Sequence, residues 1–93
     1  MQKDESIVFS KHALDQMIDR GADREEVALA ILEGEKLPAK KGRWTFKKNF
    51  SFENKWQNRY YTSKQVQPVV VLENEKWIVV TVYVFYIGGI DEN

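Results

Sequence analysis

The chain contains no cysteine, a single histidine and only two prolines among its 93 residues. The absence of cysteine excludes disulfide bonds, cysteine-ligated zinc and cysteine nucleophiles. One histidine is too few for a histidine-rich metal site, and no glycine-rich phosphate loop is present. A magnesium site made of carboxylates alone stays open, but the acids fall mostly in expected helix first turns and hairpin loops. We therefore expect no cofactor and no metal.

Long apolar runs are also lacking. The longest, from Ile78 to Ile87, is about half the length of a membrane-spanning helix and is typical of a strand. The first ten residues carry charges and no apolar run, which argues against a signal peptide. We therefore expect no membrane partner and a cytoplasmic protein. It should form a single domain over residues 1–93, with an ordered core of about 7–88 and a frayed end.

Local signals predict two helices in the first third of the chain. The first is expected over Lys11–Arg20, with Ser10 as its N-cap and Gly21 after its last turn. Asp23 and Glu26 form a capping box for a second helix, which ends before the next glycine. Each helix has an apolar stripe that should face the core. These stripes are Ala13, Leu14, Met17 and Ile18 in the first helix and Val27, Ala28, Ile31 and Leu32 in the second.

The hydrophobic pattern then changes to a period of two, which is typical of strands. The expected strands are Arg43–Phe52, Trp56–Ser63, Pro68–Leu72 and Trp77–Ile87. The intervening turns are short, so neighbouring strands should pair antiparallel. The sequence thus predicts an α+β fold in which two N-terminal helices pack on a four-stranded antiparallel sheet.

The last expected strand has two chemically different faces. We place its aliphatic face on the core under the helices and its more aromatic face on the opposite side. The first face comprises Ile78, Val80, Val82, Val84 and Tyr86, and the second comprises Trp77, Val79, Thr81, Tyr83 and Phe85.

Net charge is zero, but the charges are segregated along the chain. Residues 36–64 hold nine basic side chains and one acidic one, whereas residues 1–35 hold four basic and nine acidic ones. The basic segment is interleaved with aromatic residues, as a surface that follows phosphates and stacks on bases requires. Lysines that protect a strand edge from aggregation are the alternative. We favour an anionic partner, with these RNA contacts: Lys40, Lys41, Arg43, Lys47, Lys48 and Arg59.

His12 and the pair Thr81–Tyr83 are further candidate functional residues. His12 falls in the first turn of the first helix, away from the apolar stripe, where a neutral imidazole can act as a general base. An ordinary surface histidine is the alternative. Thr81 and Tyr83 share the non-aliphatic face of the last strand, and Lys64 is near the end of another strand. On spacing alone, high strand propensity explains Thr81 and Tyr83 equally well.

The chain resembles a bacterial family known as domain of unknown function 4258. The opening match consists of Phe9-Ser10-Lys11-His12-Ala13, Arg20-Gly21, Val27, Ile31 and Gly34. The closing match consists of Lys64-Gln65-Val66 and Thr81-Val82-Tyr83-Val84-Phe85-Tyr86. The resemblance covers most of the chain, from about Phe9 to Tyr86, and the opening motif is the more specific part.

This resemblance implies a RelE-like fold and a place among ribonuclease toxins of toxin–antitoxin pairs, which need no metal. The RNA's own 2′-hydroxyl would attack the adjacent phosphate. His12 would act as general base or acid, and Arg20 and Lys64 would neutralise the developing charge. Tyr83, with Thr81 beside it, would hold or protonate an oxygen. The implied partners are RNA, free or on the ribosome, and an antitoxin protein.

Three functions therefore compete. The leading hypothesis is a small RNA-directed domain that acts as a metal-independent endoribonuclease of toxin type. A non-catalytic module that binds RNA or DNA with the same basic surface is the first alternative. The second alternative is a protein-interaction domain that docks a partner on its acidic helices or its exposed aromatic face.

Overall fold

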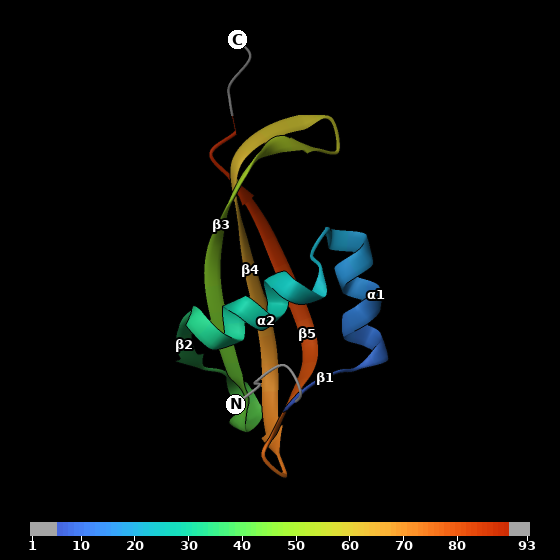
Figure 1. Ribbon diagram of the computed structural model, residues 1–93, viewed down its shortest axis with the longest axis vertical. Helices are drawn as coiled ribbons and strands as arrows, with labels where there is room; N and C mark the ends of the chain where they lie inside the picture. The colour runs from blue at the N-terminus through green and yellow to red at the C-terminus, as the bar shows by residue number, and fades with distance from the viewer. Residues whose placement is uncertain (1–5, 90–93) are drawn as a thin grey trace.

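The computed structural model describes residues 6–89, and in this range both helices lie on one side of a single sheet (Figure 1). Helix α1 runs beside strand β5 at one edge, and α2 crosses over β3 and β4. The helices are α1 (Lys11–Arg20) and α2 (Arg24–Glu33), and a short 3-10 turn, η2 (Lys40–Gly42), precedes β3. The strands are β1 (Ile7–Phe9), β2 (Glu35–Pro38), β3 (Trp44–Trp56), β4 (Arg59–Glu73) and β5 (Lys76–Ile87).

Both predicted helices are confirmed, together with their capping residues. The Ser10 side chain accepts a hydrogen bond from the Ala13 N–H at 3.0 Å. Asp23 and Glu26 form the predicted capping box, in which each side chain accepts from the other's main-chain N–H. Gly21 ends α1 with a φ of 84°, a left-handed conformation that glycine adopts at low cost. Local chemistry therefore defines this part of the fold.

The predicted four-stranded antiparallel sheet is wrong. The sheet has five strands in the order β1-β5-β4-β3-β2, and β1 pairs with β5 in parallel, which makes the sheet mixed. The two additional strands, β1 and β2, are only three and four residues long. Such short segments carry little periodic signal, and β1 pairs with residues 77–79, far along the chain. Their pairing is decided by tertiary contacts.

The boundaries of the central strands also differ from prediction. The chain does not turn at Glu53–Lys55. Instead, β3 continues to Trp56 past an irregular register between Ser51 and Asn54, and the turn is made by Gln57 and Asn58. The two segments predicted as separate strands after this point form one strand, β4. It runs uninterrupted through Pro68, which is fully buried. Beyond the helices, the β3–β4 hairpin extends as a twisted ribbon (Figure 1).

A bulge in β5 reverses which side chains face the helices. Val69 pairs with Thr81 but Val70 pairs with Val79, so Val80 has no partner in the register. Val79 and Val82 are both fully buried, and the inward residues change parity between them. The predicted faces are therefore correct from Thr81 to Tyr86 and wrong from Trp77 to Val80. A one-residue slip of this kind exchanges the two faces of a strand.

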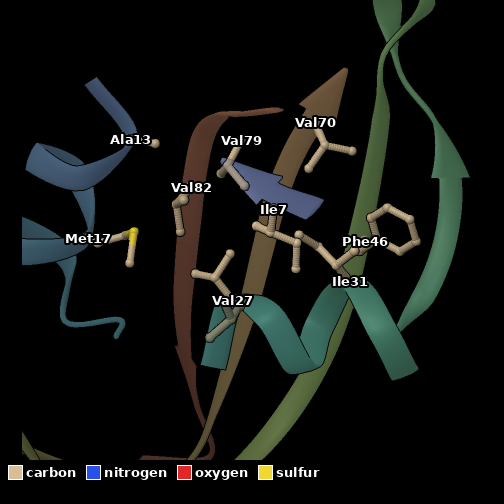
Figure 2. Packing of buried hydrophobic residues seen from close by; sticks show 10 residues of the cluster. Ile7, Ala13, Met17, Val27, Ile31, Phe46, Val70, Val79 and Val82 are labelled. Atoms are coloured by element: carbon tan, nitrogen blue, oxygen red, sulfur yellow. The ribbon is translucent and has the colours of Figure 1, made fainter. Parts of the chain in front are cut away.

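The hydrophobic core lies between the helices and the covered sheet face. Figure 2 shows Met17 and Ala13 of α1 and Val27 and Ile31 of α2 directed toward the strands. The strands contribute Ile7, Phe46, Val66, Val70, Val79 and Val82. Two residues predicted to be inward are instead exposed, Ile18 at 79% and Leu32 at 41%. Among residues 6–89, neither helix is long and apolar enough to cross a membrane. The predicted frayed end concerns residues 90–93, which lie outside the described residues.

Candidate functional site

Helix α1 covers the edge of β5 that β1 leaves free. Strand β1 pairs only with residues 77–79. Further along this edge, the Gln16 side-chain oxygen accepts a hydrogen bond of 2.8 Å from the Val82 N–H. The Arg20 guanidinium donates one of 2.8 Å to the Val82 carbonyl oxygen. Because Gln16 and Arg20 are one helical turn apart, α1 provides hydrogen-bond partners for both the N–H and the carbonyl oxygen of Val82.

The hydrogen bond to Val82 also brings the Arg20 side chain to the sheet face opposite the helices, which we call the uncovered face. Its guanidinium carbon lies 5.4 Å from the centre of the Tyr83 ring, within the range of a cation–π interaction. Tyr83 is 44% exposed and directed to the side opposite the helices. A guanidinium carries five N–H donors, so the bond to Val82 leaves several of them for an anion. Arg20 and Tyr83, two of the predicted site residues, are thus adjacent.

His12 lies on the same stripe of α1. Positions 12, 16 and 20 are successive i, i+4 neighbours, and Gln16 and Arg20 define the side that faces β5. The His12 side chain is exposed and makes no hydrogen bond or ion pair with residues 6–89. It is displaced from Arg20 by about 12 Å along the helix axis, at 1.5 Å per residue. His12 therefore borders the site at a distance from Tyr83.

Thr81 shares the uncovered face with Tyr83. It is half-buried, and it lies opposite Val69 of β4 in the strand register. The bulge at Val80 places Thr81 at the start of the stretch of β5 whose faces were predicted correctly. Thr81 and Tyr83 therefore lie side by side, as the sequence predicted.

Lys64 lies on the other side of the sheet. Its side chain is only 7% exposed, and its ammonium group lies 2.8 Å from a Glu26 carboxylate oxygen. It also donates a hydrogen bond of 2.8 Å to the Gly21 carbonyl oxygen at the end of α1. The sheet separates Lys64 from Tyr83, and Glu26 neutralises its charge. Lys64 therefore links β4 to the end of α1, through Gly21, and to α2, through Glu26.

Tyr86, which the sequence did not indicate as a site residue, binds the end of α1 from strand β5. Its hydroxyl donates to the Arg20 carbonyl oxygen at 2.8 Å, and its ring stacks on Trp56 with centroids 5.0 Å apart. Burial, together with the negative charge of Glu26, raises the pKa of Tyr86 to about 12. The phenol is therefore kept protonated as a donor. Only the closing family match, which ends at Tyr86, pointed to this residue.

The predicted RNA contacts do not form one patch. Lys40, Lys41 and Arg43 are exposed at η2, before β3 begins, whereas Arg59 follows the far end of β3. A strand of 13 residues spans about 40 Å, so these cations lie at opposite ends. Lys48 faces the helices and pairs with Glu33 at 3.3 Å. Lys47 is the one predicted contact that alternation places on the uncovered face.

Most aromatic residues of the basic segment pack against other side chains of the protein: Phe52, Trp56 and Tyr61 surround the Tyr86 ring. Phe46 is buried, and Trp44 and Phe50 pack against the core. The alternation in β3 that the sequence shows is real, but its aromatic side faces the helices. Aromatic rings on the uncovered face come instead from β5, as Tyr83 and Phe85, exposed by 44% and 47%.

Charge divides between the two layers of the molecule. The strand segments 44–52, 59–72 and 77–87 contain no acidic residue and four basic ones. Half of the ten acids in residues 6–89 lie in the helices, and Asp23 caps α2. The others are Glu35 of β2, Glu53 at the irregular register of β3, and Glu73 and Glu75 near the β4–β5 turn. In residues 6–89, no cluster of three or more histidine, aspartate or glutamate side chains could hold a metal ion. On the uncovered face, Glu35 is the register neighbour of Lys47.

A family model described as domain of unknown function (DUF4258) matches residues 9–84. The matched range includes both helices, most of the sheet and each predicted site residue. The family resemblance noted in the opening and closing motifs is thereby confirmed. No curated protein and no solved structure matches the chain.

Proposed function

We propose that this chain, which belongs to the family described as domain of unknown function DUF4258, binds RNA and cleaves it without a metal, as a relative of the RelE-like toxins. One observation carries the proposal. The Arg20 guanidinium lies over the Tyr83 ring at the border of an uncovered sheet face, beside strand segments 59–72 and 77–87 that contain no acidic residue. His12 lies on the same stripe of α1. A cation, a phenol and an imidazole thus border one surface.

In this proposal the RNA supplies its own nucleophile. The 2′-oxygen forms a bond to the adjacent phosphorus, and the bond from phosphorus to the 5′-oxygen breaks, which leaves a 2′,3′-cyclic phosphate and a 5′-hydroxyl. His12 accepts the proton of the 2′-hydroxyl while water protonates the leaving 5′-oxygen, or His12 protonates the 5′-oxygen while water accepts the proton of the 2′-hydroxyl. Arg20 neutralises the charge that develops on the phosphate oxygens, and Tyr83 donates a hydrogen bond to one of them. Lys64 has no role in this step, because its ammonium is engaged by Glu26.

Cleavage of labelled RNA in the presence of EDTA tests this proposal. Wild type is compared with His12→Ala and Tyr83→Phe, alone and with ribosomes added. We expect cleavage by wild type and a loss of about a hundredfold or more in each variant, since a general acid or base contributes about 10²–10⁴ in rate. Ile18→Ala is a matched control, because Ile18 is on the same helix and is 79% exposed. It should cleave like wild type.

A non-catalytic RNA-binding module is the second candidate, and the state of Lys64 favours it. One of the two cations expected at the phosphate is buried and already paired, so charge neutralisation would rest on Arg20. This candidate predicts salt-sensitive RNA binding that His12→Ala leaves unchanged. Binding without cleavage by wild type, with and without ribosomes, would replace the first candidate by the second.

A further inference from the structure

The uncovered face of the sheet presents two aromatic rings in the same orientation. Tyr83 and Phe85 follow each other on one side of β5, with ring centroids 6.5 Å apart and ring planes inclined by 21°. Both are more than two-fifths exposed. Exposed rings on a sheet that helices cover on one side only are suited to stacking with flat ligands.

A row of amide side chains runs beside these rings. Gln67 lies opposite Tyr83 and Gln65 lies opposite Phe85 in the β4–β5 register. Gln67 donates a hydrogen bond to the Gln65 side-chain oxygen, and Gln65 donates one of 2.9 Å to the Asn49 side-chain oxygen. An amide has two donors and an acceptor, so donors and acceptors remain free beside each ring. This combination matches the polar edges of nucleobases.

The charges around this face favour an anionic chain. The three long strands have no acidic residue in segments 44–52, 59–72 and 77–87. Arg20 lies over Tyr83 at one edge of the face. Lys47 lies toward the other edge, where Glu35 of β2 is its neighbour in the register. Arg20 at the β5 edge, with neutral rings and amides beside it, fits a phosphate backbone along that edge with its bases turned inward.

We propose that this face seats an unpaired RNA segment, with successive bases stacked on Tyr83 and Phe85 and their edges bound by Gln67 and Gln65. The inference rests on the proposed function and names its substrate class. Bases in a duplex have their faces covered by their neighbours and their Watson–Crick edges paired, so a duplex cannot use these rings or amides. Single-stranded RNA is therefore selected over double-stranded RNA by the face itself.

Fluorescence anisotropy with a labelled oligonucleotide tests this selection. The riboses are 2′-O-methylated, because without the attacking hydroxyl the strand stays intact. We expect the full-length protein to bind the single strand more tightly than the same strand annealed to its complement. Phe85→Ala should weaken single-strand binding about tenfold or more, in line with the loss of one stacked base. Phe85 has no role in the proposed chemistry, so a loss of affinity in Phe85→Ala reports on RNA binding to the uncovered face alone.

Two matched variants separate stacking from packing. Phe85→Tyr keeps an aromatic face and should retain affinity within about threefold, whereas Phe85→Leu keeps apolar volume and should bind like Phe85→Ala. Ile18→Ala, on the helical side, should bind like wild type. Thermal unfolding of each variant checks that the fold is intact.

Several outcomes would overturn the inference while the proposed function stands. They are equal affinity for single and double strands, unchanged affinity in Phe85→Ala, and wild-type affinity in Phe85→Leu. A stable dimer that Phe85→Ala dissociates would also overturn it, because a second copy would then cover the face. If wild type binds no RNA at about 0.1 M salt, the proposed function itself fails, and this inference fails with it.

Discussion

The hydroxyl of Tyr86 donates a hydrogen bond of 2.8 Å to the main-chain carbonyl oxygen of Arg20, the last residue of α1. Carbonyl groups in the last turn of a helix have no partner within the helix, and Tyr86 satisfies one of them from β5. The same residue, Arg20, extends its side chain to Tyr83. Arg20 is therefore held by two residues of β5: Tyr86 binds its main chain on the helical side of the sheet, and Tyr83 contacts its guanidinium on the uncovered side.

Stability at alkaline pH should depend on Tyr86. In the unfolded chain a tyrosine loses its proton near 10.0, whereas burial and Glu26 raise the pKa of Tyr86 to about 12 in the folded protein. Below pH 10 the stabilisation is fully present. Between pH 10 and 12 the unfolded state releases a proton that the folded state keeps, so the free energy of unfolding falls. Urea denaturation below and above pH 10 measures this fall.

Tyr86→Phe is the matched comparison for this effect. It keeps the ring against Trp56 and removes the hydroxyl, so it should cost about 1 kcal/mol at neutral pH. It should also lose less stability than wild type between pH 10 and 12. Identical pH dependence in the two proteins would contradict the raised pKa of Tyr86.

Breaking the pair between Lys64 and Glu26 should destabilise the protein strongly. The two side chains are only 7% and 21% exposed, and removing one partner of a buried ion pair costs about 3–5 kcal/mol. Lys64→Ala should therefore lower the free energy of unfolding by about 3 kcal/mol, as measured by denaturant titration. Glu26→Gln should also destabilise, because it leaves the buried ammonium without a counter-charge.

The exposed pair between Lys11 and Asp15 is the control for this prediction. Their side chains are 89% and 59% exposed and lie 3.2 Å apart. Exposed pairs contribute about 0–1 kcal/mol, so Lys11→Ala should change stability little. A Lys64→Ala effect as small as that of Lys11→Ala would mean that Lys64 is not buried as described.

Gly21→Ala should destabilise more than Gly42→Ala. Both glycines have positive φ, 84° and 72°, and alanine in that region costs about 1–2 kcal/mol. At Gly21 an added Cβ would also lie 2.8 Å from the Trp56 ring and would contact the Tyr86 hydroxyl, whereas nothing lies within 4 Å at Gly42. Denaturation of both variants isolates the additional clash. Equal losses would show that the space around Gly21 is open.

Gln16→Ala should expose the free edge of β5. The Val82 N–H loses the acceptor that lies 2.8 Å away, and an unsatisfied main-chain donor costs about 1–3 kcal/mol. An open strand edge also favours pairing between molecules. We expect faster amide exchange at Val82 and a concentration-dependent increase in light scattering. Unchanged exchange at Val82 would exclude the protective role of Gln16.

The candidate site could be predicted in part. The family motif and exposure pointed to His12, Arg20 and Tyr83, and α1 and β5 bring the last two together. The motif also pointed to Lys64, but sequence spacing cannot tell that Glu26, 38 positions earlier, binds its ammonium. The basic segment was visible as a run of charge, yet a long strand distributes its cations to opposite ends.

The sequence by itself determined the two helices and the charge segregation, because N-caps, a capping box and a left-handed glycine act within a few residues. Only the tertiary structure decided the parallel pairing of β1, the bulge at Val80 and the burial of Lys64. The pairing of β1 and the burial of Lys64 depend on partners tens of residues away, and the bulge depends on the register of β5 against β4. A single bulge exchanges the side chains on one side of it between core and solvent without a change in local pattern, since the period of two continues on either side of it.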